Sequence, residues 1–189
     1  MARCDYIPVD ILRQTLKYDP KTGKLFWRER PAYMFPDSGS GGAAGCAKRW
    51  NARCAGKEAL SHKTRGGYLA GPVLGQVRIS HQVAWAVYYG AWPKNPIDHI
   101  NGIRDDNRIG NLRSVSYSEN AKNQRLPKNN KSGAMGVRLY KPTGKWLAVI
   151  GVGGKRIHLG YFDTKGSAIA ARKQAEEDYG YHVNHGRNP

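Results

Sequence analysis

The segment from residue 97 to residue 125 constrains the fold most, because its hydrophobic pattern changes repeatedly over a short length. Asp98 and His99 stand side by side near its start, and a polar loop rich in Asp and Asn follows them. Residues 112–116 then alternate apolar and polar, as a short strand does. Ser118 can cap a helix, and good helix formers follow it. The pattern therefore predicts a strand, a loop, a second strand and a helix, in this order.

Asp98 and His99 have side chains that suit phosphodiester hydrolysis. Neighbouring side chains of a strand point to opposite faces, so the carboxylate can hold a metal ion while the imidazole faces a water molecule. A hard divalent cation takes oxygen ligands, and a His can accept a proton from water near neutral pH. Asn120, in the predicted helix, would supply a second oxygen. An Asp-His pair before Asn-Gly is also typical of a plain turn, and only the ordered set of positions favours catalysis.

The segment resembles the HNH nuclease motif, also called the His-Me finger or ββα-metal motif, as found in homing endonucleases of phages and introns. The resemblance implies that Asp98 is the first metal ligand, that His99 is the general base and that Asn120 is the final ligand. The middle Asn of the motif braces the loop and orients the base. Asn111 matches it best, and Asn107 is the competing candidate. The implied cofactor is one divalent metal ion, with Mg²⁺ expected and Mn²⁺ as a substitute, and no zinc is expected.

The charge balance indicates a polyanionic partner. The chain has 31 Lys and Arg residues against 14 Asp and Glu, which gives a net charge of +17 at pH 7. The basic residues are spread through a sequence with five Trp and eleven Tyr, and no basic amphipathic helix is evident. Double-stranded DNA is therefore the expected partner, rather than a membrane surface.

The apolar runs and the cysteine spacing indicate the cellular compartment that is expected for the protein. No run is long enough to span a bilayer, and the N-terminus lacks the apolar core of a signal peptide. Cys4, Cys46 and Cys54 form no CxxC pair, so neither a disulfide framework nor a zinc ribbon is indicated. We expect an intracellular protein in the host cell of a phage or bacterium, and not a secreted one.

Residues 1–30 are predicted to pack as scaffold. Apolar residues at helical spacing predict a helix over residues 9–17, and residues 25–27 predict a short apolar strand after a turn. The sequence LKYDPKTGKLFW at residues 16–27 also resembles the N-terminal segment of many phage HNH proteins. Residues 31–66, rich in Gly, Ala, Ser and Pro, are interpreted as a flexible basic insertion.

The residues just before the Asp-His pair predict a hairpin and a helix. Residues 68–70 and 75–80 predict two strands, and residues 81–89 predict a helix with an apolar face that ends at Gly90. His81 opens this helix, and a capping or core role is favoured for it over an approach to the active site.

Residues 136–179 predict three strands and a helix. The strands are expected at residues 136–140, 145–152 and 155–162, and the helix at residues 164–179. The segment resembles the ethylene-response-factor (Apetala) DNA-binding domain through its GVR, GKW and LGYF motifs and its Ala-rich helix. In that family the sheet lies in the major groove. The resemblance implies that the following residues contact DNA: Arg138, Tyr140, Lys145, Trp146 and Arg156, with His158 as a further candidate. A packing role in the core or sheet is an equal alternative for Trp146.

The complete prediction is an α+β protein with a ββα-metal HNH nuclease domain before a small domain of three antiparallel strands and a helix. The nuclease domain is expected at residues 1–126, with its core motif at 78–125, and the second domain at 134–183. A basic linker over residues 127–133 carries Lys128 and Lys131, which suit contact with the DNA backbone. Residues 184–189 are expected to form a tail.

The predicted function is that of a metal-dependent, site-specific DNA endonuclease of the homing type. With one ββα site per chain, a monomer is expected to nick one strand, without an obligate protein partner. The alternative is a DNA-binding regulator or architectural protein with an inactive nuclease motif. A restriction or structure-specific nuclease is a third possibility, for which a sequence-reading domain is less useful.

Overall fold

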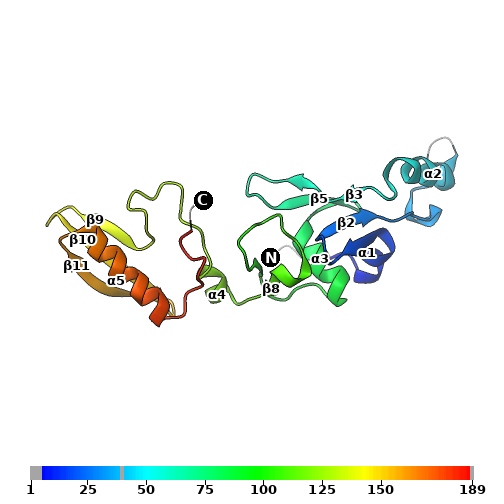
Figure 1. Cartoon of the computed structure of the whole chain (residues 1–189). Helices are drawn as coiled ribbons and strands as arrows, with labels where there is room; N and C mark the ends of the chain where they lie inside the picture. The colour runs from blue at the N-terminus through cyan, green and yellow to red at the C-terminus, as the bar shows by residue number, and fades with distance from the viewer. Residues whose placement is uncertain (1–5, 39–40, 188–189) are drawn as a thin grey trace. The chain divides into compact units, whose positions relative to one another are not determined.

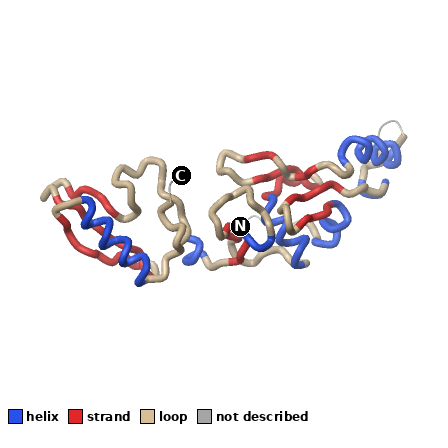
Figure 2. The backbone as a smooth tube through the Cα atoms, in the orientation of Figure 1, coloured by secondary structure: helices blue, strands red, loops and turns tan. Residues whose placement is uncertain are grey.

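The computed structural model describes residues 6–38 and 41–187, apart from the side chain of Ser118. The chain divides into two compact units, Met1–Ser114 and Val115–Pro189, and each is described by itself. Both units combine helices with small antiparallel sheets, as predicted (Figures 1 and 2). Within the described residues, no helix is both long and apolar enough to cross a membrane.

The core of the first unit lies between two helices and a sheet. The sheet has the strand order β1-β2-β3, and its buried residues include Leu12, Leu16, Leu25 and Val83. The elements are α1 (Val9–Thr15), β1 (Leu16–Asp19), β2 (Lys24–Trp27), β3 (Glu58–Ala59) and α3 (Ser80–Tyr89). The predicted helix over residues 9–17 ends earlier, at Thr15, because Leu16 pairs with Trp27 and begins a hairpin that the sequence analysis missed.

A second sheet and a short hairpin complete the first unit. The sheet has the order β4-β5-β6, and β7 pairs with β8 in an antiparallel hairpin. The strands are β4 (His62–Lys63), β5 (Leu69–Val73), β6 (Gln76–Ile79), β7 (Ile97–His99) and β8 (Leu112–Ser114). The predicted hairpin, the helix after it and the two strands around the Asp-rich loop are thus all present. Gly90 ends α3 with a φ of 78°, a left-handed conformation that glycine adopts easily.

The interpretation of residues 31–66 as a flexible insertion was wrong for much of its length. It contains η1 (Ala32–Met34) and the helix α2 (Gly42–Cys54), together with β3 and β4. Composition suggested a linker, but aromatic packing stabilises the helix. The Trp50 ring of α2 lies 5.4 Å from the Trp27 ring, centroid to centroid. The guanidinium of Arg30 lies 4.6 Å from the centre of the Trp50 ring.

The second unit begins with a short helix and continues with the predicted sheet and helix. α4 (Tyr117–Ala121) is shorter than predicted. The side chain of Ser118, the predicted cap, lies outside the described residues. Ser116 acts as the cap, because its Oγ accepts from the Glu119 backbone N–H at 3.2 Å while Glu119 Oε2 accepts from the Ser116 N–H at 2.8 Å.

The sheet of the second unit has the strand order β11-β10-β9, and α5 covers one of its faces. Its elements are β9 (Val137–Tyr140), β10 (Lys145–Val152), β11 (Lys155–Phe162) and α5 (Lys165–Asp178). Thr164 caps α5 by accepting from the Ser167 backbone N–H at 3.1 Å. The three predicted strands and the predicted helix are confirmed.

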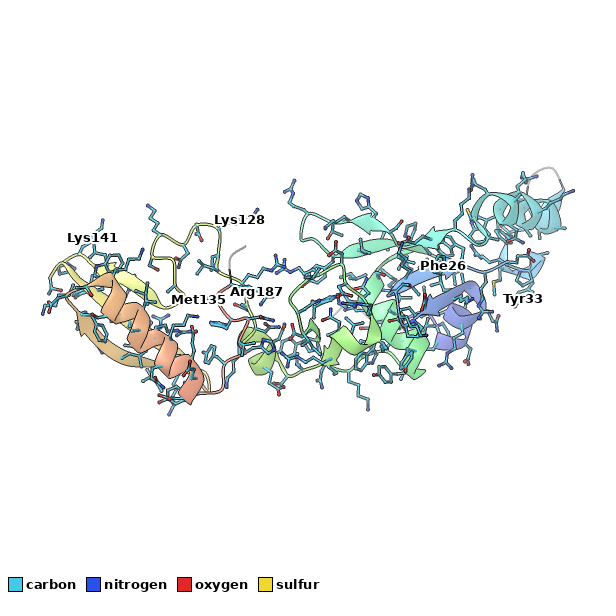
Figure 3. All side chains as sticks on the ribbon, viewed as in Figure 1. Phe26, Tyr33, Lys128, Met135, Lys141 and Arg187 are labelled. Carbon is cyan, nitrogen blue, oxygen red and sulfur yellow. The ribbon has the colours of Figure 1, made fainter. Side chains whose placement is uncertain are left out.

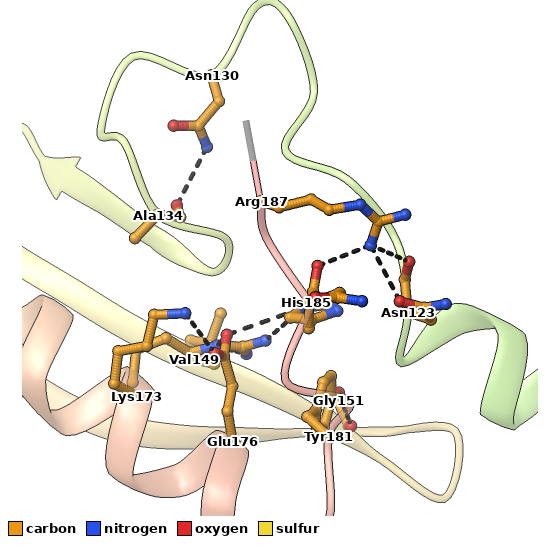
Figure 4. A network of polar contacts seen from close by, with 12 residues as sticks. Asn123, Asn130, Ala134, Val149, Gly151, Lys173, Glu176, Tyr181, His185 and Arg187 are labelled. Carbon is orange, nitrogen blue, oxygen red and sulfur yellow. Dashed lines mark hydrogen bonds and ion pairs between the residues drawn. The ribbon is translucent and has the colours of Figure 1, made fainter. Parts of the chain in front are cut away.

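Residues 181–187, which follow α5, pack back onto this unit, so residues 184–187 do not form the predicted tail. The backbone N–H of Gly186 donates to Gln124 at 2.8 Å, and that of Leu126 donates to Arg187 at 2.9 Å. Figure 4 shows polar contacts beside this return, including those of Glu176, His185 and Arg187. The segment after α4 is therefore tied to Gly186 and Arg187, which are far from it in sequence.

Candidate active site

His99 lies at the end of β7 and is almost fully buried, with 3% of its surface exposed. Its Nε2 lies 3.0 Å from the Oδ1 of Asn107. An amide oxygen only accepts hydrogen bonds, so Nε2 carries the hydrogen and the lone pair of the neutral ring lies on Nδ1. Burial lowers the pKa of His99, although the Asn107 hydrogen bond and the charges of Asp98 and Asp106 oppose this shift. The ring is therefore neutral at pH 7 and able to accept a proton.

Asn107 has a second feature that fits a functional position. Only 1% of its surface is exposed, and its Nδ2 has no hydrogen-bond partner among the described residues. A buried amide donor without a partner costs free energy, which a folded protein rarely tolerates except at a functional site. The Nδ2 group is thus a donor beside His99 that a water or a substrate oxygen can satisfy.

Asn111 has a different position in the same loop. Its Nδ2 donates to the Asp106 backbone carbonyl at 2.7 Å, and its Oδ1 accepts from the Asn101 backbone N–H at 3.0 Å. Asn101 in turn donates from Nδ2 to Asp106 Oδ2 at 2.7 Å. The sequence left open whether Asn107 or Asn111 is the middle Asn. In the structure Asn111 closes the loop, and Asn107 contacts the His99 ring.

Asp98 is paired across the hairpin with Arg113, a residue that the sequence analysis missed. Asp98 and Arg113 are opposite each other in the register of β7 and β8. Arg113 donates to Asp98 Oδ2 from Nε at 3.0 Å and from Nη2 at 2.8 Å. The guanidinium compensates the charge of this nearly buried carboxylate. The sequence does not show this pair, because the residue opposite Asp98 depends on the register of β7 and β8.

The described residues contain no cluster of three or more His, Cys, Asp or Glu side chains that could hold a metal ion. Asn120, the other predicted ligand, lies in α4 and belongs to the second unit. The predicted HNH residues that lie in the first unit are Asp98, His99, Asn107 and Asn111. Asp98 is the member of this group with a charged oxygen donor.

His81 and Tyr68 contact the His99 ring, and here the preference for a capping or core role of His81 was incomplete. The ring centroids of His81 and His99 lie 5.0 Å apart in an edge contact, and the Tyr68 ring lies 5.3 Å from His81 and 5.9 Å from His99. His81 is 6% exposed, and its Nδ1 has no hydrogen-bond partner among the described residues. His81 is thus both a buried residue and a neighbour of the candidate base.

The burial of His81 predicts acid sensitivity. Two causes lower the pKa of His81 to about 3: burial is the larger, and the nearby His99 is the smaller. The unfolded chain binds a proton there near pH 6.5 and the folded chain does not, so stability is present above pH 6.5 and is lost as pH falls toward 3. Between pH 7 and pH 5 we expect a loss of about 2 kcal/mol from this residue. His81→Phe should remove this part of the pH dependence of the free energy of unfolding.

The measurement is urea unfolding at pH 7 and at pH 5, with Trp fluorescence as the probe of the unfolding transition. Four of the five Trp residues, Trp27, Trp50, Trp85 and Trp92, lie in the first unit and report on it. His62→Phe is the matched control, because His62 is exposed. An equal pH dependence in the wild type and in His81→Phe would contradict the prediction.

The hairpin of β1 and β2 supports the loop that carries Asn107. The Tyr18 hydroxyl donates to the Asn107 backbone carbonyl at 2.7 Å, and the Ile109 backbone N–H donates to the Pro20 carbonyl at 3.2 Å. Gly23 has a φ of +76°, and a Cβ there would lie 2.5 Å from the Asn107 backbone carbon. The turn after Tyr18 therefore needs glycine to approach the loop this closely. The sequence analysis assigned this hairpin segment to packing only.

Tyr18→Phe is expected to lower the activity of the site about tenfold, because one hydrogen bond that positions Asn107 is lost while the ring remains. Burial raises the pKa of the Tyr18 hydroxyl, so this group is a donor at all working pH values. Tyr33→Phe is a matched control, since Tyr33 donates to Gln14 at 2.9 Å on the surface of the same unit. The measurement is the single-turnover rate of the predicted nicking of DNA. Equal rates for the two variants would refute a positioning role.

The second unit holds the predicted DNA-contacting residues, and most share one face of its sheet. Arg138 and Tyr161 both pair with Leu147, so these side chains lie on one side. The Tyr161 ring lies 5.1 Å from Tyr140 and 4.8 Å from His158. Lys145, opposite Tyr140, forms a surface ion pair with Asp163 at 3.1 Å. This face, which lies away from α5 and carries Arg138, Tyr140, His158 and Tyr161, is termed the open sheet face.

Trp146 is not part of the open sheet face. It packs against the buried cluster of Val137, Ala148 and Ala168 that α5 covers. The sequence could not show this, because the face of a strand residue depends on the register and on which side the helix packs. The remaining candidates, Arg156, Lys128 and Lys131, are exposed; Figure 3 shows the side chains of both units and labels Lys128.

Comparison with known proteins identifies the segment around Asp98. A family model described as HNH endonuclease matches residues 78–122. The chain is also similar to Protein 3.8 of Escherichia phage T7, with 34% identity over 77 residues, which make up 40% of this chain and 64% of that protein. No solved structure has significant similarity to the chain. The family match ends before the sheet of the second unit and gives no support to the resemblance of residues 136–179 to an ethylene-response-factor domain.

The matched segment includes α3, the loop and both strands of the β7–β8 hairpin. His81, Asp98, His99, Asn107 and Asn111 all lie inside it. The contacts of His99 with Asn107 and of Asp98 with Arg113 are therefore contacts within the matched region. Residues 78–122 thus match the HNH endonuclease family model.

Proposed function

We propose that this protein is a metal-dependent DNA endonuclease in which His99 is the general base. The observation that carries the proposal is the neutral, buried imidazole of His99, held by Asn107 beside the carboxylate of Asp98. A base for hydrolysis at neutral pH must be unprotonated and fixed in orientation, and His99 meets both conditions. The match of the surrounding residues to HNH endonucleases supports the same reaction class.

In the proposed reaction, His99 takes a proton from a water molecule at Nδ1. The water oxygen forms a bond to the scissile phosphorus, and the bond from phosphorus to the 3′-oxygen breaks. Asn107 keeps the ring oriented by accepting from Nε2. Arg113 holds Asp98 in position. The orienting contacts of Asn107 and Arg113 both lie within the first unit.

Asp98 is the proposed ligand in the first unit for one divalent cation, with Mg²⁺ expected and Mn²⁺ as a substitute; Asn120, the other predicted ligand, lies in the second unit. The carboxylate and amide oxygens fit this choice, because Mg²⁺ prefers hard oxygen donors and no thiol is among the candidates. When bound, the cation would neutralise charge on the scissile phosphate and on the leaving oxygen.

Double-stranded DNA is the proposed substrate, and the second unit is proposed to recognise its sequence. The net charge of +17 supports binding to a polyanion. Arg138 and Arg156 are exposed arginines that suit bidentate contacts with guanine, and Lys128 and Lys131 suit phosphate contacts. A sequence reader joined to a nuclease favours the homing type of endonuclease, which would act inside a host cell.

The test is nicking of supercoiled phage or plasmid DNA in Mg²⁺ and in EDTA. We expect nicked circles in Mg²⁺, none in EDTA, and DNA binding in both. Binding without cleavage in Mg²⁺, on DNA that contains the cognate sequence, would instead support the DNA-binding regulator. Concerted double-strand breaks by a preparation shown to be monomeric by sedimentation would refute nicking by a monomer.

A further inference from the structure

The helix α2 of the first unit has one face that is firmly anchored. The Asn51 side chain exchanges two hydrogen bonds with the backbone of Arg30, at 2.9 and 3.0 Å. The Arg30 guanidinium packs against two rings, 4.7 Å from the centre of Phe35 and 4.6 Å from that of Trp50. Asp37 Oδ1 accepts from the backbone N–H of Ala43 at 3.1 Å near the start of the helix. These contacts fix the orientation of α2, and with it the direction of its opposite face.

The opposite face of α2 is exposed and carries only positive charge. Lys48, Arg49 and Arg53 are exposed on successive turns, and Lys57 follows just after the helix. No Asp or Glu occurs from residue 38 to residue 57. Lys48, Arg53 and Lys57 form no ion pair with any described residue. A folded surface that leaves several cations without counter-charges favours an anionic partner.

Small residues separate the charges on this face. Ala44 and Ala52 lie one turn before and one turn after Lys48, and both are exposed. A helix with alanine at these positions can approach a flat or ridged partner closely, so that the flanking Lys and Arg side chains reach along it. The 13 residues of α2 make it about 20 Å long, which is a span of several phosphates along a DNA strand.

We propose that the exposed face of α2, formed by Ala44, Lys48, Arg49, Ala52 and Arg53, binds the sugar-phosphate backbone of duplex DNA. The proposal rests on the proposed function for the identity of the polyanion. It assigns to the first unit a contact surface outside the site around His99 and outside the open sheet face. Because phosphates look alike in every sequence, this surface adds affinity without adding base preference.

The test is the salt dependence of binding to a duplex in EDTA, measured by fluorescence anisotropy. The variant is Lys48→Ala/Arg49→Ala/Arg53→Ala, in which alanine preserves the helix because of its high helix propensity. Each phosphate contact contributes about 0.9 to the slope of log K against log salt, so we expect the slope to fall by about 2 to 3. Thermal unfolding should show that the variant is folded.

The matched control is Lys17→Ala/Lys21→Ala/Lys94→Ala, which removes the same charge from other exposed positions of the first unit. We expect its slope to differ from the wild type by less than about 1. An unchanged slope in the α2 variant, or an equal fall in both variants, would overturn the proposal. Since binding in EDTA needs no catalysis, the result is independent of whether the wild type cleaves DNA in Mg²⁺.

Discussion

His99→Ala is expected to lower the rate of DNA nicking by about a hundredfold to ten-thousandfold, the usual contribution of a general base. The substitution removes the only imidazole that Asn107 orients through a hydrogen bond in the described structure. DNA binding in EDTA should stay within about twofold, because His99 is buried and does not belong to a basic surface. The measurement is the single-turnover rate on supercoiled DNA in Mg²⁺.

His62→Ala is the control for this experiment. His62 lies in β4 of the same unit and is exposed, so its loss removes the same side chain without touching the cluster around His99. We expect this variant to nick DNA at the wild-type rate. Full activity in His99→Ala would show that another group takes the proton, and the proposed role of His99 would then be wrong.

Arg172→Met is expected to destabilise the second unit by about 3 kcal/mol, because removing one member of a buried ion pair leaves its partners uncompensated. Arg172 is 4% exposed. It donates from Nε to Glu176 at 2.9 Å and from Nη1 to the Val149 backbone carbonyl at 2.6 Å, and its Nη2 lies 3.3 Å from Nε2 of His185. Methionine would fill much of the volume but would satisfy none of these groups.

Lys173→Met is the matched control, since Lys173 forms an ion pair with the same carboxylate, Glu176, at 2.9 Å but is about half exposed. An exposed ion pair contributes about 1 kcal/mol or less. The measurement is amide hydrogen exchange in β10, where a loss of 3 kcal/mol lowers protection by about two orders of magnitude. Equal losses in the two variants would mean that burial of the Arg172 network does not set the stability of this unit.

The elements that the sequence predicted well are those with a local signal. The three strands of the second unit alternate apolar and polar residues between glycine turns, and α5 follows a Thr cap, so each element can be recognised within its own residues. The same holds for α3, which ends at Gly90. The Asp-His pair and the Asn residues after it also stand close together in sequence, and the match of residues 78–122 to HNH endonucleases covers them.

The tertiary structure decided the contacts that join distant segments. Tyr18 reaches Asn107 across a sequence separation of 89 residues, and no periodicity connects the two. The pairing of Arg113 with Asp98 and the position of Trp146 on the α5 side depend on strand register and helix placement. The helix α2 forms in a Gly- and Ala-rich segment because Trp50 packs on Trp27 and Arg30. Periodicity and caps act within a few residues, so the sequence alone determined the elements and the candidate base, whereas burial and long-range packing determined which side chains hold that base in place.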